Sequence, residues 1–400
     1  MNKYWFYKVG LVVVFLCFAL LGGAKVKLPT LVSDGMVLQR GEPVNIWGTA
    51  DPDETVDITF LKKKYKTVAD VQGNWKVTLP ILKAGGPYTM AINDIELKDI
   101  LIGDVWVCSG QSNMELNYSQ YYEGSGNSYN FGGGLITTDD LPKQLSDNNV
   151  HFVASANSSK GTDFPLRDVN EQAGTWLEAT ADNSQHFSYL AQQFAMQLRA
   201  AHPNVPIGII QTAWGGTPIR RHVQGGDIYA NHIAPLEGFH VAGVLWYQGC
   251  NDSTNEATAL AYESQMTLLI NQYREVFDQD DLPFLYVQLA RWPGYQYTQN
   301  VRFAQLNTLS NAGLRNASNV AMTVSLDTDK GTSTLIHPLG KDILGARMAA
   351  QYLAMSEGKT TPQRAAYRTC EACFRWHDRI VVPERHRNRF AGGKAQLFED

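Results

Sequence analysis

Short runs of alternating apolar and polar residues dominate the chain between residues 25 and 100. The clearest runs cover residues 44–48, 55–60 and 75–80, and turn residues such as Gly and Pro separate them. Alternation with a period of two predicts strands that bury one face, because successive side chains of a strand point to opposite sides. Since no helical pattern lies between these runs, we expect residues 25–100 to form a small antiparallel β-sandwich domain.

The pattern changes between residues 101 and 360. Continuous apolar runs indicate buried strands, and in the stretches between them apolar residues recur every three or four positions, as in helices. The strand-like runs are 101–107, 207–213, 241–247, 284–289 and 320–326, and the helix-like stretches are 187–201, 259–277 and 340–353. Such alternation is typical of βαβ units, so we expect an α/β domain with a mostly parallel sheet covered on both faces. Residues 118–165, rich in Tyr, Gly, Ser and Asn, are predicted to be a long loop insertion.

The first 24 residues have the pattern of a secretory signal peptide. Two lysines precede an apolar run over residues 11–21, and three small residues follow at 22–24. This order is typical of a cleaved export signal. The apolar run is short for a membrane span, so we expect a secreted or periplasmic protein, with an uncleaved anchor as the alternative.

Residues 361–400 fit neither domain. From residue 363 onward they carry eight basic and five acidic residues, without a clear hydrophobic period. Two interpretations of this segment remain open: a poorly ordered end of the chain, or a truncated further domain. Cys370 and Cys373 form a lone Cys-x-x-Cys, and without a second pair at suitable spacing we do not expect a zinc site there.

Composition narrows the classes of function. Hydrophobic residues make up 44% of the chain and charged residues 18%, which are globular values. The net charge of −5 argues against nucleic acid as a partner, and no lysine-rich run suggests a membrane surface. The few cysteines do not form the dense pattern of a disulfide framework. The oligomeric state is left open.

Polar clusters follow four of the predicted strands. They are residues 110–113, 214–218, 248–252 and 327–338. Carboxyl ends of parallel strands share one edge of the sheet, so these clusters are expected to converge on one crevice. Any one of them alone is more often a turn, a helix cap or a packing residue. Together they supply a serine, a histidine and groups that could stabilise an oxyanion, which is the set an acyl-transfer enzyme needs.

The first cluster lies in a segment that resembles a known family. Residues 103–115 read Gly-Asp-Val-Trp-Val-Cys-Ser-Gly-Gln-Ser-Asn-Met-Glu, and they resemble the first motif block of the sialate O-acetylesterases, a branch of the SGNH hydrolases. Further resemblances cover residues 31–40 and 44–48 of the N-terminal β-domain, the second and third blocks at 211–218 and 245–250, and the last block at 336–338 with Lys341. The resemblance extends from about residue 28 to residue 353.

This resemblance implies both a fold and an activity. The fold is a three-layer α/β/α, flavodoxin-like SGNH hydrolase domain over residues 101–360, preceded by the β-sandwich. The activity is hydrolysis of O-acetyl esters on carbohydrates, and it requires no metal or cofactor. Family members often carry a further C-terminal β-domain, which would make residues 361–400 a truncated part of it.

The resemblance also implies roles for individual residues. Ser112 would attack the acetyl carbonyl, and His337 would take its proton. The oxyanion would be held by the backbone N–H of Ser112, by Gly215 or Gly216, and by the side chain of Asn251. Gln111 and Gln248 lie in the same segments and are further candidates for substrate binding. Ser109 is a rival nucleophile, but it precedes Gly110 and is predicted to lie within the strand.

The acid that would orient His337 is unassigned. Many SGNH enzymes have an Asp three residues before the histidine, where this chain has Thr334. Asp327 and Asp329 are candidates for that role, and a backbone carbonyl is an alternative. Relatives often have Glu where Cys250 stands, and we interpret Cys250 as a packing residue.

Two other functions remain open on the sequence alone. The same machinery could act on acetylated xylan or another plant polysaccharide, with aromatic side chains as stacking platforms. The candidate platforms are Tyr121, Tyr122, Trp292 and Tyr295. The missing acid also leaves room for a non-catalytic carbohydrate-binding protein on an esterase scaffold.

Overall fold

The computed structural model describes residues 26–122, 144–157, 168–169, 175–328 and 336–359. The predicted signal peptide and the tail from residue 361 lie outside the described residues. Within the described ranges, no helix has both the length and the apolar character that a membrane span requires.

The N-terminal part of the chain is built from β-strands. They are β1 (Val37–Gln39), β2 (Val44–Thr49), β3 (Thr55–Phe60), β4 (Lys63–Val68), β5 (Asn74–Leu79) and β6 (Gly85–Ile92). β2 and β5 pair antiparallel, and β3 pairs antiparallel with both β4 and β6. Buried and exposed positions alternate along β3 and β5, which confirms the period-two prediction for these strands.

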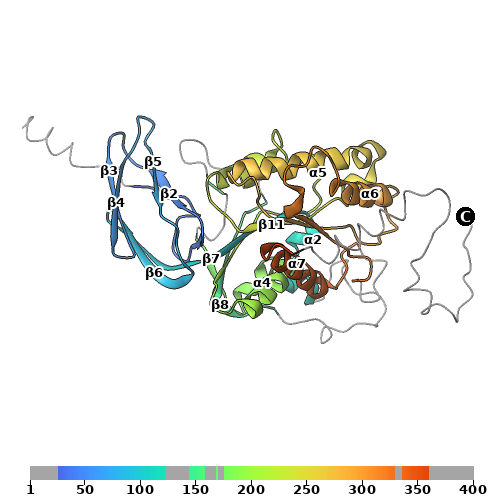
Figure 1. Ribbon diagram of the computed structural model, residues 1–400, viewed down its shortest axis with the longest axis horizontal. Helices are drawn as coiled ribbons and strands as arrows, with labels where there is room; N and C mark the ends of the chain where they lie inside the picture. The colour runs from blue at the N-terminus through green and yellow to red at the C-terminus, as the bar shows by residue number, and fades with distance from the viewer. Residues whose placement is uncertain (1–25, 123–143, 158–167, 170–174, 329–335, 360–400) are drawn as a thin grey trace, which may run out of the picture.

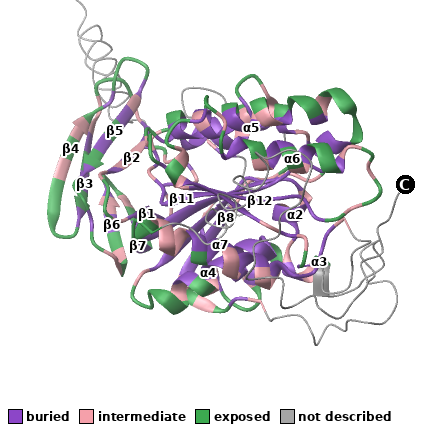
Figure 2. Ribbon diagram, turned by 45° about the vertical axis from the view of Figure 1, so that its right-hand side comes forward, coloured by how far each residue is buried: buried purple, intermediate pink, exposed green. Residues whose placement is uncertain are grey.

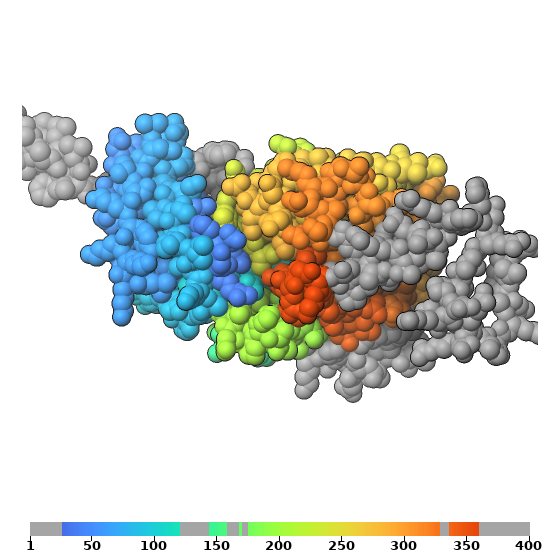
Figure 3. Space-filling model, in the orientation of Figure 1, coloured from blue at the N-terminus to red at the C-terminus, as the bar shows by residue number. Residues whose placement is uncertain are grey.

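One long strand connects this part to the rest of the molecule. β7 (Ile95–Gly110) begins by pairing with β6 and continues into the middle of the central sheet. β1 pairs with it in parallel, with Val37 opposite Leu101. The N-terminal strands therefore pack against one end of the molecule (Figure 3), with no linker between them and the larger part.

The central sheet is mostly parallel. Its order is β13-β12-β11-β7-β10-β8-β9, and only β9 runs antiparallel to its neighbour. The bounds are β8 (Asp147–Ala154), β9 (Leu177–Ala179), β10 (Ile207–Gln211), β11 (Gly243–Tyr247), β12 (Phe284–Val287) and β13 (Val320–Thr323). Every residue of β10, β11, β12 and β13 is buried. These strands confirm the four apolar runs predicted after residue 200.

Helices cover both faces of this sheet (Figures 1 and 2). α5 (Glu256–Val276) and α6 (Thr298–Thr308) lie on one face, and α4 (Tyr189–Ala201) and α7 (Lys341–Ser356) lie on the other. The three predicted helices correspond to α4, α5 and α7. The shorter elements are α2 (Ser112–Glu115), α3 (Tyr118–Tyr122), the 3₁₀ turns η2 (Asn183–His186), η3 (Ile219–Arg221), η5 (Ala234–Leu236), η6 (Asp252–Thr254) and η7 (Ala317–Asn319), and the π turn η4 (Tyr229–Ile233).

The prediction of a long loop insertion over residues 118–165 is wrong in part. β8 lies inside this range and pairs in parallel with β10. Its only large apolar residues are Val150, Phe152 and Val153, and three polar residues precede them. A run of this length does not stand out from a polar loop, although the strand pairs with both β10 and β9.

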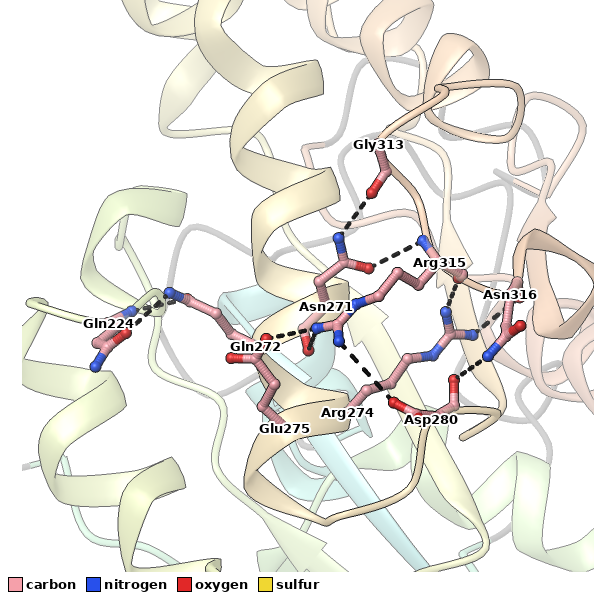
Figure 4. Close-up of polar contacts among 9 residues, drawn as sticks. All are labelled: Gln224, Asn271, Gln272, Arg274, Glu275, Asp280, Gly313, Arg315 and Asn316. Carbon is pink, nitrogen blue, oxygen red and sulfur yellow. Dashed lines mark hydrogen bonds and ion pairs between the residues drawn. The ribbon is translucent and has the colours of Figure 1, made fainter.

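A buried arginine joins the end of α5 to two loops (Figure 4). Arg274 lies in the last turn of α5 and is 1% exposed. Its guanidinium donates to the backbone carbonyls of Leu282, Arg315 and Asn316. Burial lowers the pKa of Arg274 to about 10, so the group stays charged at neutral pH. These loops lead into β12 and β13, and one side chain therefore positions two strands.

Replacing Arg274 with methionine is expected to lower the free energy of unfolding by about 2–4 kcal/mol. Methionine fills much of the volume but leaves three buried carbonyls without their charged donor. The free energy of unfolding of Arg274→Lys should lie between those of the parent and Arg274→Met, because one ammonium cannot reach all three carbonyl oxygens. Urea unfolding followed by circular dichroism measures the effect. A midpoint that is unchanged in Arg274→Met would contradict this role.

Candidate active site

Three neighbouring strands end at the centre of the sheet. β10 and β11 flank β7, so the segments that follow these strands come together. Gly110 closes β7 with φ of 131°, and a Cβ there would lie 2.4 Å from the carbonyl oxygen of Tyr247. Only glycine allows this conformation and this close approach. The chain then turns directly into α2, whose first residue is Ser112.

Ser112 and His337 meet at this point. The Nε2 atom of His337 lies 2.8 Å from the Oγ atom of Ser112, although 225 positions separate the two residues. Burial, followed by the positive charge of Lys341, lowers the pKa of His337 to about 3. The imidazole is therefore neutral at pH 7, and its Nε2 can accept the serine proton.

Two buried side chains hold the segments that carry this pair. The Nδ2 atom of Asn113 donates to the carbonyl of Ile336 at 3.0 Å. The Nζ atom of Lys341 donates to Oδ1 of Asn113 at 2.7 Å and to the carbonyl of Pro338 at 3.1 Å. These bonds tie the residue after Ser112 to the residues on both sides of His337. The sequence placed Asn113 and Lys341 in motif blocks but suggested no role for either.

Gly215 lies beside Ser112, but its backbone N–H is already bonded. A Cβ on Gly215 would lie 3.5 Å from Cβ of Ser112, while its N–H donates to Oε2 of Glu115 at 2.5 Å. The other oxygen of Glu115 accepts from Asn157. Burial raises the pKa of Glu115, and the two hydrogen bonds oppose that shift. Sequence reasoning missed Glu115, because nothing in its motif indicates which N–H it binds.

Asn251 joins the second and third strand-end segments. Its Nδ2 donates to the carbonyl of Gly216 at 3.1 Å. Asn251 is half-buried and Gly216 is exposed. Gly216 has φ of 69°, and a Cβ there would meet no atom within 4 Å. These two residues therefore border open space next to the segment that carries Gly215.

The side chains of Gln111 and Gln248 have structural roles, which corrects the prediction that they bind substrate. Gln248 is 0% exposed, and its amide donates to the carbonyl of Thr217 at 2.9 Å and to Asp252 at 2.5 Å. The Oε1 atom of Gln111 accepts the backbone N–H groups of Gly249 at 3.1 Å and Asn251 at 3.3 Å. Both glutamine side chains therefore hold the loop after β11 in place through hydrogen bonds.

Asp327 is not placed to orient His337. Its carboxylate accepts two hydrogen bonds from the guanidinium of Arg347, at 2.7 and 2.6 Å. Among the described residues, no hydrogen bond or ion pair joins it to His337. Arg347 lies on α7, so Asp327 fixes the loop after β13 to that helix. The other candidate, Asp329, lies outside the described residues together with Thr334.

Two possible rival nucleophiles are buried. Ser109 lies within β7 as predicted, is 0% exposed, and its Oγ is 3.1 Å from the hydroxyl of Tyr273. Cys250 is 6% exposed, and burial raises the pKa of its thiol to about 12. The thiolate is the reactive form of cysteine, so this residue is inert at neutral pH.

A surface groove lies near Ile336, the residue before His337. Cys250 and Ile336 share a small crevice with Trp292 and Thr298. These last two residues also line an open groove of about 490 Å³. Its other lining residues are Arg291, Pro293, Tyr295, Gln296, Gln299 and Arg302. The Trp292 and Tyr295 rings meet edge to face, with their centroids 6.1 Å apart.

Comparisons with known proteins agree with this geometry. The family model described as carbohydrate esterase, sialic acid-specific acetylesterase, matches residues 102–354. Sialate O-acetylesterase of Homo sapiens is 27% identical over 399 residues, covering 85% of this chain and 73% of that protein. The same enzyme of Mus musculus is 24% identical, covering 84% and 74%. A solved carbohydrate acetylesterase from Xanthomonas citri superposes with a TM-score of 0.70 and 30% identity, covering 84% of this chain and 76% of that one.

Proposed function

The chain belongs to the carbohydrate esterase family of sialic acid-specific acetylesterases, and from this premise we propose that Ser112 and His337 cleave acetyl esters on a sialic acid. The single observation that supports this site is the 2.8 Å contact between Nε2 of His337 and Oγ of Ser112. A nucleophile within hydrogen-bond reach of a neutral imidazole is the arrangement that serine acyl transfer requires.

The reaction proceeds in two halves. His337 takes the hydroxyl proton as Oγ of Ser112 attacks the acetyl carbonyl, and the tetrahedral intermediate expels the sugar oxygen, which receives that proton. A water molecule, deprotonated by His337, then attacks the acetyl-enzyme; the C–O bond to Oγ breaks, His337 returns the proton to Oγ, and acetate leaves. A positioned general base contributes about 10²–10⁴-fold to the rate.

The negative oxygen of the intermediate needs hydrogen-bond donors. The first intrahelical bond of α2 starts from Met114, which bonds to Gln111, so the N–H of Ser112 precedes the helix ladder and suits this role. The amide hydrogen of Asn251 that does not bind Gly216 is a second donor. The backbone N–H of Gly216 is a third. The N–H of Gly215 can join only when Glu115 releases it, because one N–H cannot point at both oxygens. One such donor is worth about 3 kcal/mol of barrier.

We extend the proposal to the organisation of the chain. Residues 25–100 form a β-sandwich domain, which the β2–β5 pair and the sheet of β3, β4 and β6 support. Residues 101–360 form the three-layer SGNH domain, supported by the parallel sheet with helices on both faces. The first 24 residues direct export to the periplasm or the medium, because of their charge and apolar pattern.

The groove beside Trp292 supports an anionic sugar as substrate. Arg302 is half-buried, and burial, followed by the charge of Arg291, lowers its pKa. The Nε atom of Arg302 is buried without a hydrogen-bond partner among the described residues, and arginine matches the geometry of a carboxylate. Trp292 and Tyr295 offer faces on which a sugar ring can stack. A neutral xylan chain offers no partner for this charge.

Replacing Arg302 with glutamine is expected to change substrate preference. Losing a charge-assisted hydrogen bond should lower kcat/KM for O-acetylated sialic acid about 10–100-fold, while acetylated xylan stays within about threefold of the parent. Arg302→Lys should retain part of the activity on the sialic acid. Acetate release measures both substrates. Equal losses on the two substrates would exclude a carboxylate-binding role, and a parent enzyme that prefers xylan would favour the plant-polysaccharide alternative.

A further inference from the structure

A second cluster of ligating side chains lies away from Ser112, where β7 enters the central sheet. Asp99 of β7, His151 of β8 and Glu178 of β9 each place one ligand atom within 4.8 Å of those of the other two. His151 and Glu178 are direct partners in the β8–β9 ladder. Asp99 lies where the pairing of β6 with β7 is irregular, and its φ of 57° directs the chain out of the ladder.

His151 is held in the orientation of a metal ligand. It is 1% exposed, and its Nδ1 lies 2.6 Å from the carbonyl oxygen of Gly35. A carbonyl only accepts, so Nδ1 carries the hydrogen and the Nε2 of a neutral ring presents its lone pair. Metal-binding histidines are typically fixed in this way, through an N–H donated to a backbone carbonyl.

The Nε2 atom of His151 is buried and has no hydrogen-bond partner among the described residues. The closest carboxylate oxygen is Oδ2 of Asp99 at 3.7 Å, beyond hydrogen-bond range. A buried polar atom without a partner is costly, and such an atom facing two carboxylates calls for a positive group between them.

We propose that Asp99, His151 and Glu178 bind a divalent cation, and that Zn²⁺ fits this donor set best. One imidazole nitrogen with two carboxylate oxygens suits zinc, whereas magnesium and calcium prefer oxygen alone. Zinc–ligand bonds of about 2.1 Å place ligand atoms about 3.4 Å apart at tetrahedral angles. The ligand atoms, now within 4.8 Å of one another, therefore have to approach by up to about 1.4 Å when zinc binds. The Asp99 side chain is 50% exposed, so it can move and water can complete the shell.

A cation here links the N-terminal strands to the edge of the central sheet. Asp99 and Gly35 come from the N-terminal side, and the backbone N–H of Gly35 bonds to the carbonyl of Lys98, the residue before Asp99. His151 and Glu178 come from β8 and β9. The proposed role is therefore structural, independent of ester hydrolysis, and its test does not use enzyme activity.

The test compares zinc binding in the full chain and in Asp99→Asn and Glu178→Gln. Cys370→Ser and Cys373→Ser are introduced throughout, since those thiols could also take up zinc. After EDTA treatment and dialysis, the parent is expected to bind one zinc per chain, and its Tm should rise by about 4 °C at a hundred times the Kd. Each variant should bind at least about tenfold more weakly. Glu96→Gln is the control, because this 59% exposed carboxylate of β7 lies outside the cluster.

Two outcomes would overturn the proposal. One is a parent Tm that does not respond to zinc, or responds equally to magnesium. The other is a loss of stability in Asp99→Asn that is the same with and without zinc, which would leave only an ion pair between Asp99 and a protonated His151. Cobalt absorption of the parent gives a check that does not depend on the folding of any variant, since imidazole and carboxylate ligation of Co²⁺ in the parent is expected to produce visible bands.

Discussion

Replacing Ser112 with alanine is expected to lower kcat/KM for an aryl acetate by about 10⁴–10⁶-fold. The substitution removes the only oxygen that His337 contacts at 2.8 Å among the described residues, so no acetyl-enzyme can form. The fold should persist, because Ser112 begins a four-residue helix held by backbone bonds from Met114 and Glu115 to Gln111. Initial rates and a circular dichroism spectrum check both parts.

A fluorophosphonate probe makes this prediction specific. The parent should be labelled on Ser112, and Ser112→Ala should not be labelled. Ser109→Ala is the matched control, because the Oγ of Ser109 is buried against Tyr273 and the variant should keep its label. Residual activity of Ser112→Ala within tenfold of the parent would rule out Ser112 as the nucleophile. A folded parent that resists labelling would favour the non-catalytic carbohydrate-binding alternative.

Replacing Asn113 with alanine is expected to lower kcat about 10²–10³-fold with little change in KM. Asn113 binds the carbonyl of Ile336 and the ammonium of Lys341 at once, and it thereby fixes His337 relative to Ser112. A displacement of about 1 Å at the reacting atoms costs about 10²-fold. The loss also leaves the buried Lys341 ammonium short of an acceptor, so unfolding should become easier by about 2–4 kcal/mol.

Three further measurements distinguish positioning from general damage. Asn113→Asp keeps an acceptor for Lys341 but loses the donor to Ile336, so it should recover stability more than kcat. Asn148 is an exposed asparagine of β8, and the control variant Asn148→Ala should match the parent in both stability and kcat. The rate of fluorophosphonate labelling should fall in parallel with kcat. An Asn113→Ala variant with raised KM and unchanged kcat would place Asn113 in substrate binding instead.

The elements that the sequence predicted well are those in which burial is continuous. β10, β11, β12 and β13 are buried at every position, and an unbroken apolar run is visible without any knowledge of tertiary structure. β8 and α6 were missed for the opposite reason. Half of β8 is polar, and only five of the eleven residues of α6 are buried, polar Gln305 among them. Tertiary contacts, rather than local pattern, determine these two elements.

The candidate site shows a similar division. Strand ends and motif spacing were enough to bring Ser112, Gly215, Asn251 and His337 together. Strand ends and motif spacing do not show which way a side-chain amide points. Gln111 and Gln248 were therefore predicted to bind substrate, although their amides form hydrogen bonds with the loop after β11. Glu115 was missed, because a carboxylate one turn after the serine resembles any helix residue. His151 was missed because the carboxylates near it, Asp99 and Glu178, come from two other strands.

The continuity of β7 determines whether the N-terminal strands can be separated from the rest of the enzyme. Its first residues belong to the hydrogen-bonding network of β6, and its last residues deliver Ser112. Cutting the chain near residue 100 would remove the partners of a strand whose other half is the central strand of the hydrolase. The N-terminal module is therefore not an exchangeable accessory, because a single continuous strand joins its sheet to the segment that carries Ser112.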